Sequence, residues 1–236
     1  METMILVVLG AGLAIGLGAI GSAIGEGYIA MNAMQALGRQ PGASQKILRL
    51  MIIGQAITET AAIFALVMSL VLLFGVGGGD GSTIKAVSYL AAGIAIGFGT
   101  IGSGFGAGLP GGSAMKGLGR NPENSDVLTV QMIIGQAVTQ TSTIFALTVS
   151  LILVTLNPED SFLKIFALLG GACAMGFGAI GPGIGDGIVA KNANEAVGKS
   201  PKHMGLLTRT MIIGQAITET TDIYSLVVSL ILIFVV

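Results

Sequence analysis

The sequence predicts an all-α membrane protein built from three tandem transmembrane helical hairpins, six spans in all. Three observations lead to this fold class. The chain is 53% hydrophobic and only 10% charged, its 236 residues contain a threefold internal repeat, and each repeat holds two long apolar segments. A soluble domain carries about 25% charged residues, so the composition points to the membrane.

The repeat is clearest in one heptapeptide. Gly54–Thr60 reads GQAITET, Gly135–Thr141 reads GQAVTQT and Gly214–Thr220 reads GQAITET again. Repeats of this kind mark one structural unit used several times. We therefore divide the chain into hairpin 1 (1–78), hairpin 2 (79–158) and hairpin 3 (159–236).

Each hairpin begins with a glycine-rich apolar segment and continues, after a short polar link, with a segment rich in Leu, Ile and Val. A helix rises 1.5 Å per residue, so about 20 residues cross the roughly 30 Å of hydrocarbon, and helices satisfy their own backbone there. The glycine-rich segments are 6–37, 84–118 and 162–197, and the second segments are 47–74, 127–156 and 206–236. The first segment lacks a basic leader, so we expect it to be a span and not a signal peptide.

Basic residues predict the orientation. They gather around the three links inside the hairpins, whereas only Lys85 and Lys164 lie near the opposite ends. The positive-inside rule then places the links in the cytoplasm and both termini outside. The basic residues near the links are Arg39, Lys46, Arg49, Lys116, Arg120, Lys191, Lys199, Lys202 and Arg209.

Glycines are closely spaced along the first segment of every hairpin, which lets helix backbones approach each other on more than one side. Such helices suit the inner wall of a crowded ring. The string GxGxxG occurs at Gly16, Gly97 and Gly176. A dinucleotide site would need a preceding strand, and these strings lie within membrane helices, so we do not assign one.

Other classes of function are disfavoured. A net charge of -1 offers no basic surface for nucleic acid. The single cysteine, Cys173, excludes an intrachain disulfide, and His203 in a polar link is an isolated histidine. No nucleotide-binding loop occurs, so the chain is not expected to be an enzyme by itself or to hold a tightly bound cofactor.

Acidic residues at membrane depth carry the functional prediction. The first segments hold Glu26 and Asp186 at equivalent positions, with Ala107 in hairpin 2, and the second segments hold Glu59, Gln140 and Glu219. A carboxylate at mid-membrane costs about 2.5 to 3.5 kcal/mol on the insertion scale. Paired carboxylates in low dielectric must bind a cation or a proton.

Helix geometry places such a site between hairpins. Glu219 and Thr220 are successive, so their side chains diverge by about 100° and do not easily serve one ion from one helix. We expect the glutamate from one hairpin and the threonine hydroxyl from the next, with a carbonyl of Ile57, Val138 or Ile217 as a further ligand. Oxygen ligands alone favour a hard monovalent cation.

These residues resemble the proteolipid rotor subunits of rotary ATP synthases, called c subunits, over essentially the whole chain, with three copies fused. The glycine-rich first helix, the mid-membrane acid and the links carry the resemblance. The links are Arg39-Gln40-Pro41, Arg120-Asn121-Pro122 and Lys199-Ser200-Pro201, and they are most similar to the F-type family. Fused hairpins with a lost acid are more typical of V-type and some archaeal rotors, so the branch stays open.

The resemblance implies a ring of identical chains that couples ion flow to ATP synthesis or hydrolysis elsewhere in the complex. The links would contact the central stalk, and the acids would carry H⁺ or Na⁺ and unload against an arginine of the stator a subunit. A prokaryotic plasma (inner) membrane, with its lipid around the ring, is the expected location.

The third hairpin is similar to Na⁺-carrying members of the family. The resemblance implies Na⁺ ligands at Asp186, Glu219, Thr220, Thr221 and Tyr224 with the Ile217 carbonyl. Hairpin 1 keeps Glu26, Glu59 and Thr60 but has Ala61 and Phe64 where the family has Thr and Tyr, so the Na⁺ assignment is less complete there. Hairpin 2, with Gln140, should load no ion itself but can lend Thr141 and the Val138 carbonyl to a neighbour.

Two alternatives remain from the residues alone. A repeat-built cation channel or secondary transporter would hold its site within one bundle at a repeat interface. Two spans per repeat give all three repeats the same orientation, whereas inverted repeats would favour a transporter. A purely structural scaffold would have no need of the acids.

Overall fold

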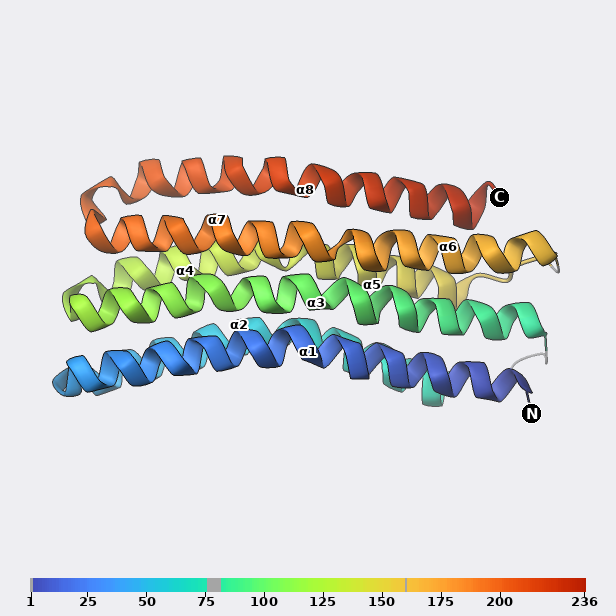
Figure 1. Cartoon of the computed structure of the whole chain (residues 1–236), viewed down its shortest axis with the longest axis horizontal. Helices are drawn as coiled ribbons and strands as arrows, with labels where there is room; N and C mark the ends of the chain where they lie inside the picture. The colour runs from blue at the N-terminus through green and yellow to red at the C-terminus, as the bar shows by residue number, and fades with distance from the viewer. Residues whose placement is uncertain (1, 76–81, 160) are drawn as a thin grey trace.

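The computed structural model describes residues 2–75, 82–159 and 161–236, and its regular elements in these ranges are all helical. Six helical spans, each long and apolar enough to cross a membrane, run along one axis. The N- and C-termini lie at one end of the bundle and the links inside the hairpins at the other (Figure 1). The predicted all-α fold with six spans is confirmed.

The helices follow the predicted segments closely. The first spans are α1 (Glu2–Arg39), α3 (Thr83–Arg120), and α6 (Phe162–Gly178) with α7 (Ile180–Lys199). The second spans are α2 (Ser44–Leu70) with the π-helical turn η2 (Val71–Gly75), α4 (Ser125–Thr139) with α5 (Thr141–Thr155), and α8 (Met204–Phe234). The predicted boundary at 78/79 lies outside the described residues, and the one at 158/159 stays a prediction.

Short 3₁₀ turns open the second spans: η1 (Pro41–Ala43), η3 (Pro122–Asn124) and η4 (Pro201–His203). A proline begins each turn, because its fixed φ suits a first helical position where an N–H has no partner to lose. The links are therefore tight.

Two spans are interrupted, which the sequence reasoning did not predict. Between α6 and α7 the break falls at Ala179, three residues before Pro182. Pro182 has no N–H, so the Gly178 carbonyl lacks its helical donor. Between α4 and α5 the break falls at Gln140, where the Thr141 hydroxyl bonds back to the Val138 carbonyl at 2.7 Å. The equivalent bond from Thr220 to Ile217 lies within the unbroken α8, so this bond alone does not account for the break.

The first spans form one layer, α1 beside α3 and α3 beside α6 and α7 (Figure 1). Glycines set their spacing. A Cβ at Gly106 would lie 2.0 Å from the Gly183 carbonyl oxygen, and one at Gly21 would lie 2.1 Å from the Ile101 carbonyl oxygen. No side chain fits at such distances, so the close backbone approach predicted from the glycines is confirmed.

The second spans form another layer. α2 packs on α1 and α3, while α4 and α5 pack on α3 and on α7 and α6. The second spans of hairpins 1 and 2 thus lie against their own first span and that of the next hairpin, while α8 packs on α6 and α7 of its own hairpin. The edges differ from the middle: α3 is buried along most of its length, whereas only five residues of α8 are buried. The edges of the chain are therefore open for further contacts.

Candidate ion-binding sites between hairpins

The glutamine of the repeated heptapeptide ties neighbouring hairpins together. Gln136 Nε2 donates to the Ala107 carbonyl of its own hairpin at 2.9 Å and to the Gly54 carbonyl of hairpin 1 at 2.9 Å. Gln215 Nε2 donates in the same way to the backbone carbonyl of Asp186 at 3.3 Å and to that of Gly135 at 3.2 Å. The sequence reasoning missed this role, although a glutamine present in all three copies was a usable signal. These bonds fix the register of adjacent hairpins just beside the acids.

Glu219 of α8 meets hairpin 2 directly. Its Oε1 accepts a hydrogen bond from the Thr141 hydroxyl of α5, and that hydroxyl also lies 2.7 Å from the Val138 carbonyl. One hydroxyl proton serves only one of these acceptors at a time. Carboxylate, hydroxyl and carbonyl oxygens from two hairpins therefore converge here, the arrangement expected of a site shared by neighbouring hairpins.

Gln140 takes the equivalent place between hairpins 1 and 2. Its Nε2 donates to the Ile57 carbonyl at 3.0 Å, and the side chain is only 6% exposed. Ile57 corresponds to Val138 in the repeat. An amide N–H thus contacts the carbonyl that a cation would need, so this place is filled by the protein.

Hairpin 1 has no preceding hairpin within the chain. Glu59 is exposed, and Glu26 of α1 is partly buried and within electrostatic range of it. The Thr60 hydroxyl bonds back to the Ala56 carbonyl at 3.3 Å. The two acids of hairpin 1 therefore lie together at an open edge of the chain.

The opposite edge carries the remaining predicted ligands. Ile217 is 67% and Tyr224 65% exposed, and the Thr220 and Thr221 hydroxyls bond back within α8, to Ile217 and Thr218. Among the described residues, no hydrogen bond joins these four to Glu219. The structure therefore brings Glu219 together with Thr141, and it leaves the hydroxyls of hairpin 3 facing outward.

Two further acids lie behind Glu219. Asp186 of α7 and Asp222 of α8 are both 0% exposed and within electrostatic range of each other and of Glu219. Asp222 lies one turn beyond Glu219, and the sequence offered no account of it. Among the described residues, no group of three or more His, Cys, Asp or Glu side chains is arranged to hold a metal ion. Any cation between hairpins 2 and 3 would need hydroxyl or carbonyl oxygens as well.

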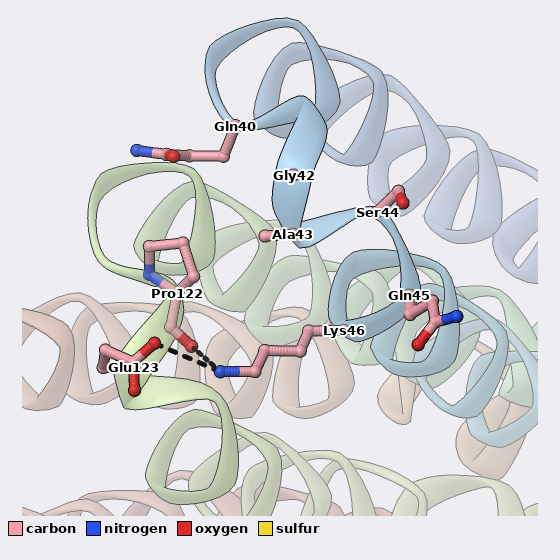
Figure 2. Close-up of a pocket in the computed structure, with 8 residues that line it drawn as sticks. All are labelled: Gln40, Gly42, Ala43, Ser44, Gln45, Lys46, Pro122 and Glu123. Carbon is pink, nitrogen blue, oxygen red and sulfur yellow. Dashed lines mark hydrogen bonds and ion pairs between the residues drawn. The ribbon is translucent and has the colours of Figure 1, made fainter.

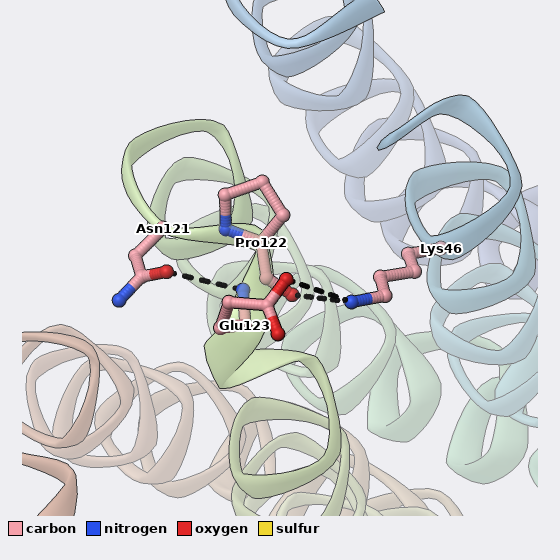
Figure 3. Close-up of polar contacts among 4 residues, drawn as sticks. All are labelled: Lys46, Asn121, Pro122 and Glu123. Atoms are coloured by element: carbon pink, nitrogen blue, oxygen red, sulfur yellow. Dashed lines mark hydrogen bonds and ion pairs between the residues drawn. The ribbon is translucent and has the colours of Figure 1, made fainter. Parts of the chain in front are cut away.

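The links lie at the end of the bundle opposite the termini (Figure 1). An open groove runs between the links of hairpins 1 and 2, lined by residues that include Gln40, Lys46 and Pro122 (Figure 2). Lys46 Nζ lies 3.3 Å from Glu123 Oε1 and 3.3 Å from the Pro122 carbonyl, and Asn121 Oδ1 accepts from the Glu123 N–H (Figure 3). Because this ion pair is exposed, it positions the links more than it stabilises them.

Comparison with known proteins agrees with this geometry. The profile of the ATP synthase c-subunit family matches residues 9–72, 90–153 and 169–232, once in each hairpin. The chain is 52% identical over 68 residues to the ATP synthase c subunit of Petrotoga mobilis, covering 29% of this chain and 71% of that protein. It is 51% identical over 74 residues to the protein of that name in Dehalococcoides mccartyi, covering 31% and 97%.

Each relative thus aligns with a stretch about as long as one hairpin, while the family profile occurs three times. The channel, transporter and scaffold alternatives explain neither finding. The chain belongs to the c-subunit family of ATP synthases, as three fused hairpin units of that family.

Proposed function

We propose that copies of this chain form a rotor ring in which cations bind at Glu59 and Glu219, travel with the ring and leave at the stator a subunit. As a family member, the chain is a non-catalytic, ion-translocating rotor component of an ATP synthase. The contact between Glu219 of one hairpin and Thr141 of the preceding hairpin carries the proposal. It makes Glu219 part of a site shared by two hairpins.

Na⁺ is the proposed coupling ion. Around Glu219 the available ligands are all oxygen: the Thr141 hydroxyl, the Val138 carbonyl and the carboxyl of Asp186. Hard cations prefer such ligands. Glu59, with Glu26 beside it, is the second carrier. Gln140 carries none, because its amide already donates to Ile57.

Ring closure completes the site at Glu59. Thr220 and Ile217 are the repeat equivalents of Thr141 and Val138, which lie against hairpin 3. In a ring, the Thr220 hydroxyl and the Ile217 carbonyl would lie against hairpin 1 of the next chain and meet its Glu59. The glycines support this contact. Gly12 and Gly16 have nothing within 4 Å, whereas their equivalents, Gly93 and Gly97, pack on the preceding hairpin. An adjacent copy would fill the open positions.

The remaining assignments concern orientation and partners. We place the links in the cytoplasm against the central stalk, with both termini outside a prokaryotic plasma membrane. Basic residues around exposed links and their separation from the acids support this arrangement. Lipid surrounds the second spans, which expose many large apolar side chains.

Carbodiimide labelling of the purified oligomer tests the carrier role. We expect modification of Glu59 and Glu219, because the protonated carboxyl is the reactive form, and protection of both by millimolar Na⁺. Mass spectrometry of each glutamate gives the readout. Labelling that is indifferent to Na⁺ at every pH would assign protons in place of Na⁺, and no modification at either glutamate would overturn the carrier role.

A further inference from the structure

The buried side chains behind Glu219 present an unusual set of oxygens. Both carboxylate oxygens of Asp186, both of Asp222 and the Ser142 hydroxyl have no hydrogen-bond partner among the described residues. All three side chains are 0% exposed. Ser142 of α5 interacts with Asp222, but in a geometry outside that of an ordinary hydrogen bond. Buried polar groups in native proteins are nearly always paired, so five unpaired oxygens in one place need an explanation.

The chemistry of these oxygens indicates which ligand they suit. The carboxylates only accept when ionised, and the hydroxyl can satisfy one acceptor at most. The residues come from three helices, α5, α7 and α8, which converge at the junction of hairpins 2 and 3. Hard cations take anionic carboxylate oxygens and neutral hydroxyl or carbonyl oxygens as ligands.

We propose that Asp222 and Ser142 form an inner cation subsite beside the carrier position at Glu219, with the carboxyl of Asp186 bordering both positions. Its ligand is a hard, oxygen-seeking metal cation, either Na⁺ or a small divalent ion. The inference rests on the proposed function only in placing the carrier ion at Glu219. Since Asp186 and Asp222 are fully enclosed while Glu219 is partly exposed, the inner cation stays in place while the outer one exchanges.

The junction of hairpins 1 and 2 lacks these groups. The positions equivalent to Asp186, Ser142 and Asp222 at the junction of hairpins 1 and 2 are Ala107, Ala61 and Thr143. The Thr143 hydroxyl bonds to Ser103, so that position is satisfied within the protein. The break before Pro182 adds a carbonyl, that of Gly178, without its helical donor on the first span of hairpin 3. Of the two hairpin junctions within the described chain, the one between hairpins 2 and 3 therefore offers the subsite.

Metal content of the purified oligomer tests the subsite. The oligomer is equilibrated with radioactive Na⁺ in chelator-treated buffer, or with Ca²⁺ or Mg²⁺, and bound metal per chain is measured. We expect one cation per chain beyond those displaced by carbodiimide at Glu59 and Glu219. Asp222→Asn should remove it, and Ser142→Ala should weaken it by about tenfold, the effect of losing about 1.4 kcal/mol of ligand interaction.

Asp126→Asn, at an exposed acid in the first turn of α4, is the charge-matched control and should leave the count unchanged. The Na⁺ and divalent arms identify the ion. If wild type, Asp222→Asn and Ser142→Ala bind equal amounts of metal, the subsite does not exist. Carbodiimide labelling of Glu59 and Glu219 in the same samples reports separately on the carrier role.

Discussion

Gln140 and Glu219 occupy equivalent positions in neighbouring repeats, but only one of them leaves room for an ion. The Gln140 amide is uncharged and donates to Ile57 at 3.0 Å, so the protein closes that place without burying a charge. Glu219 can only accept when ionised, and it faces a hydroxyl beside a carbonyl. The exchange of one carboxylate oxygen for an amide nitrogen therefore separates a closed junction from a carrier.

The pairing of hydroxyl and acid across hairpins leads to a crossed prediction. Thr141→Val should lower the Na⁺ protection of Glu219 about tenfold and leave that of Glu59 unchanged, since about 1.4 kcal/mol of ligand interaction is lost at one site. Thr220→Val should do the reverse, because in the proposed ring its hydroxyl meets Glu59 of the next chain. The measurement is carbodiimide modification of each glutamate against Na⁺ concentration.

Thr148→Val is the matched control, since Thr148 is an exposed threonine of α5 whose hydroxyl bonds back to Ile144 at 2.8 Å. It should change neither glutamate. If Thr220→Val instead weakened protection of Glu219, the direction of sharing would be the opposite of the one proposed.

Residue types at the junction and their sharing between adjacent hairpins were predictable, and the direction of sharing was not. A costly acid repeated in register with a threonine indicates an ion site, whichever neighbour supplies the hydroxyl. The direction depends on which side of α5 meets α8, a property of packing. The bridging by Gln136 and Gln215 and the enclosure of Asp222 likewise depend on three helices meeting, which no single helix reveals.

At the scale of elements, the close packing of the first spans and the breaks within two spans have different origins. Span number and length follow from hydropathy, and the close approach of first spans follows from glycine spacing. The breaks at Gln140 and Ala179 were missed because proline and threonine are often tolerated within a membrane helix. α3 itself continues through Pro110, so proline alone was a poor guide.

Glycine substitutions test the first layer. Gly106→Ala should destabilise the protein by about 1–3 kcal/mol, the usual cost of overpacking, because its Cβ would lie 2.0 Å from the backbone oxygen of Gly183. Gly205→Ala, in α8 with nothing within 4 Å, should be neutral or stabilising by up to about 1 kcal/mol. Thermal unfolding of both variants in detergent, followed by circular dichroism, gives the comparison. Equal shifts in the unfolding temperatures of the two variants would contradict the conclusion that backbone contacts set the spacing of the first spans.

For the whole molecule, fusion of three hairpins allows each junction to differ. In the proposed ring, a neighbouring chain completes the site of hairpin 1. The junction of hairpins 1 and 2 is closed, and the third hairpin holds the richest set of acids. Separate single hairpins would all be identical. A ring of these chains has two second-span carboxylates for every three hairpins, so it moves one third fewer ions per turn than a ring with a full set.

The energetic consequence follows from work per turn. Each charge crossing 100 mV is worth about 2.3 kcal/mol, so at a fixed ion-motive force the available work per turn falls by a third. The rotor then needs a larger gradient to make ATP, and it can pump against a steeper gradient when ATP drives it. We expect a machine biased toward pumping, or one that works at high ion-motive force.

Restoring the missing carrier reverses this bias. Gln140→Glu with Ala107→Glu removes the amide that donates to Ile57 and places two acids beside Ile57 and Thr60, as Glu59 and Glu26 lie together in hairpin 1. Ions moved per ATP should rise by about half, and the limiting gradient should fall by about one third, because the same free energy of ATP hydrolysis is divided among more charges. ATP-driven Na⁺ uptake into vesicles containing the whole complex measures both quantities. An active double variant in which neither quantity changes would mean that Gln140 does not set the number of ions carried.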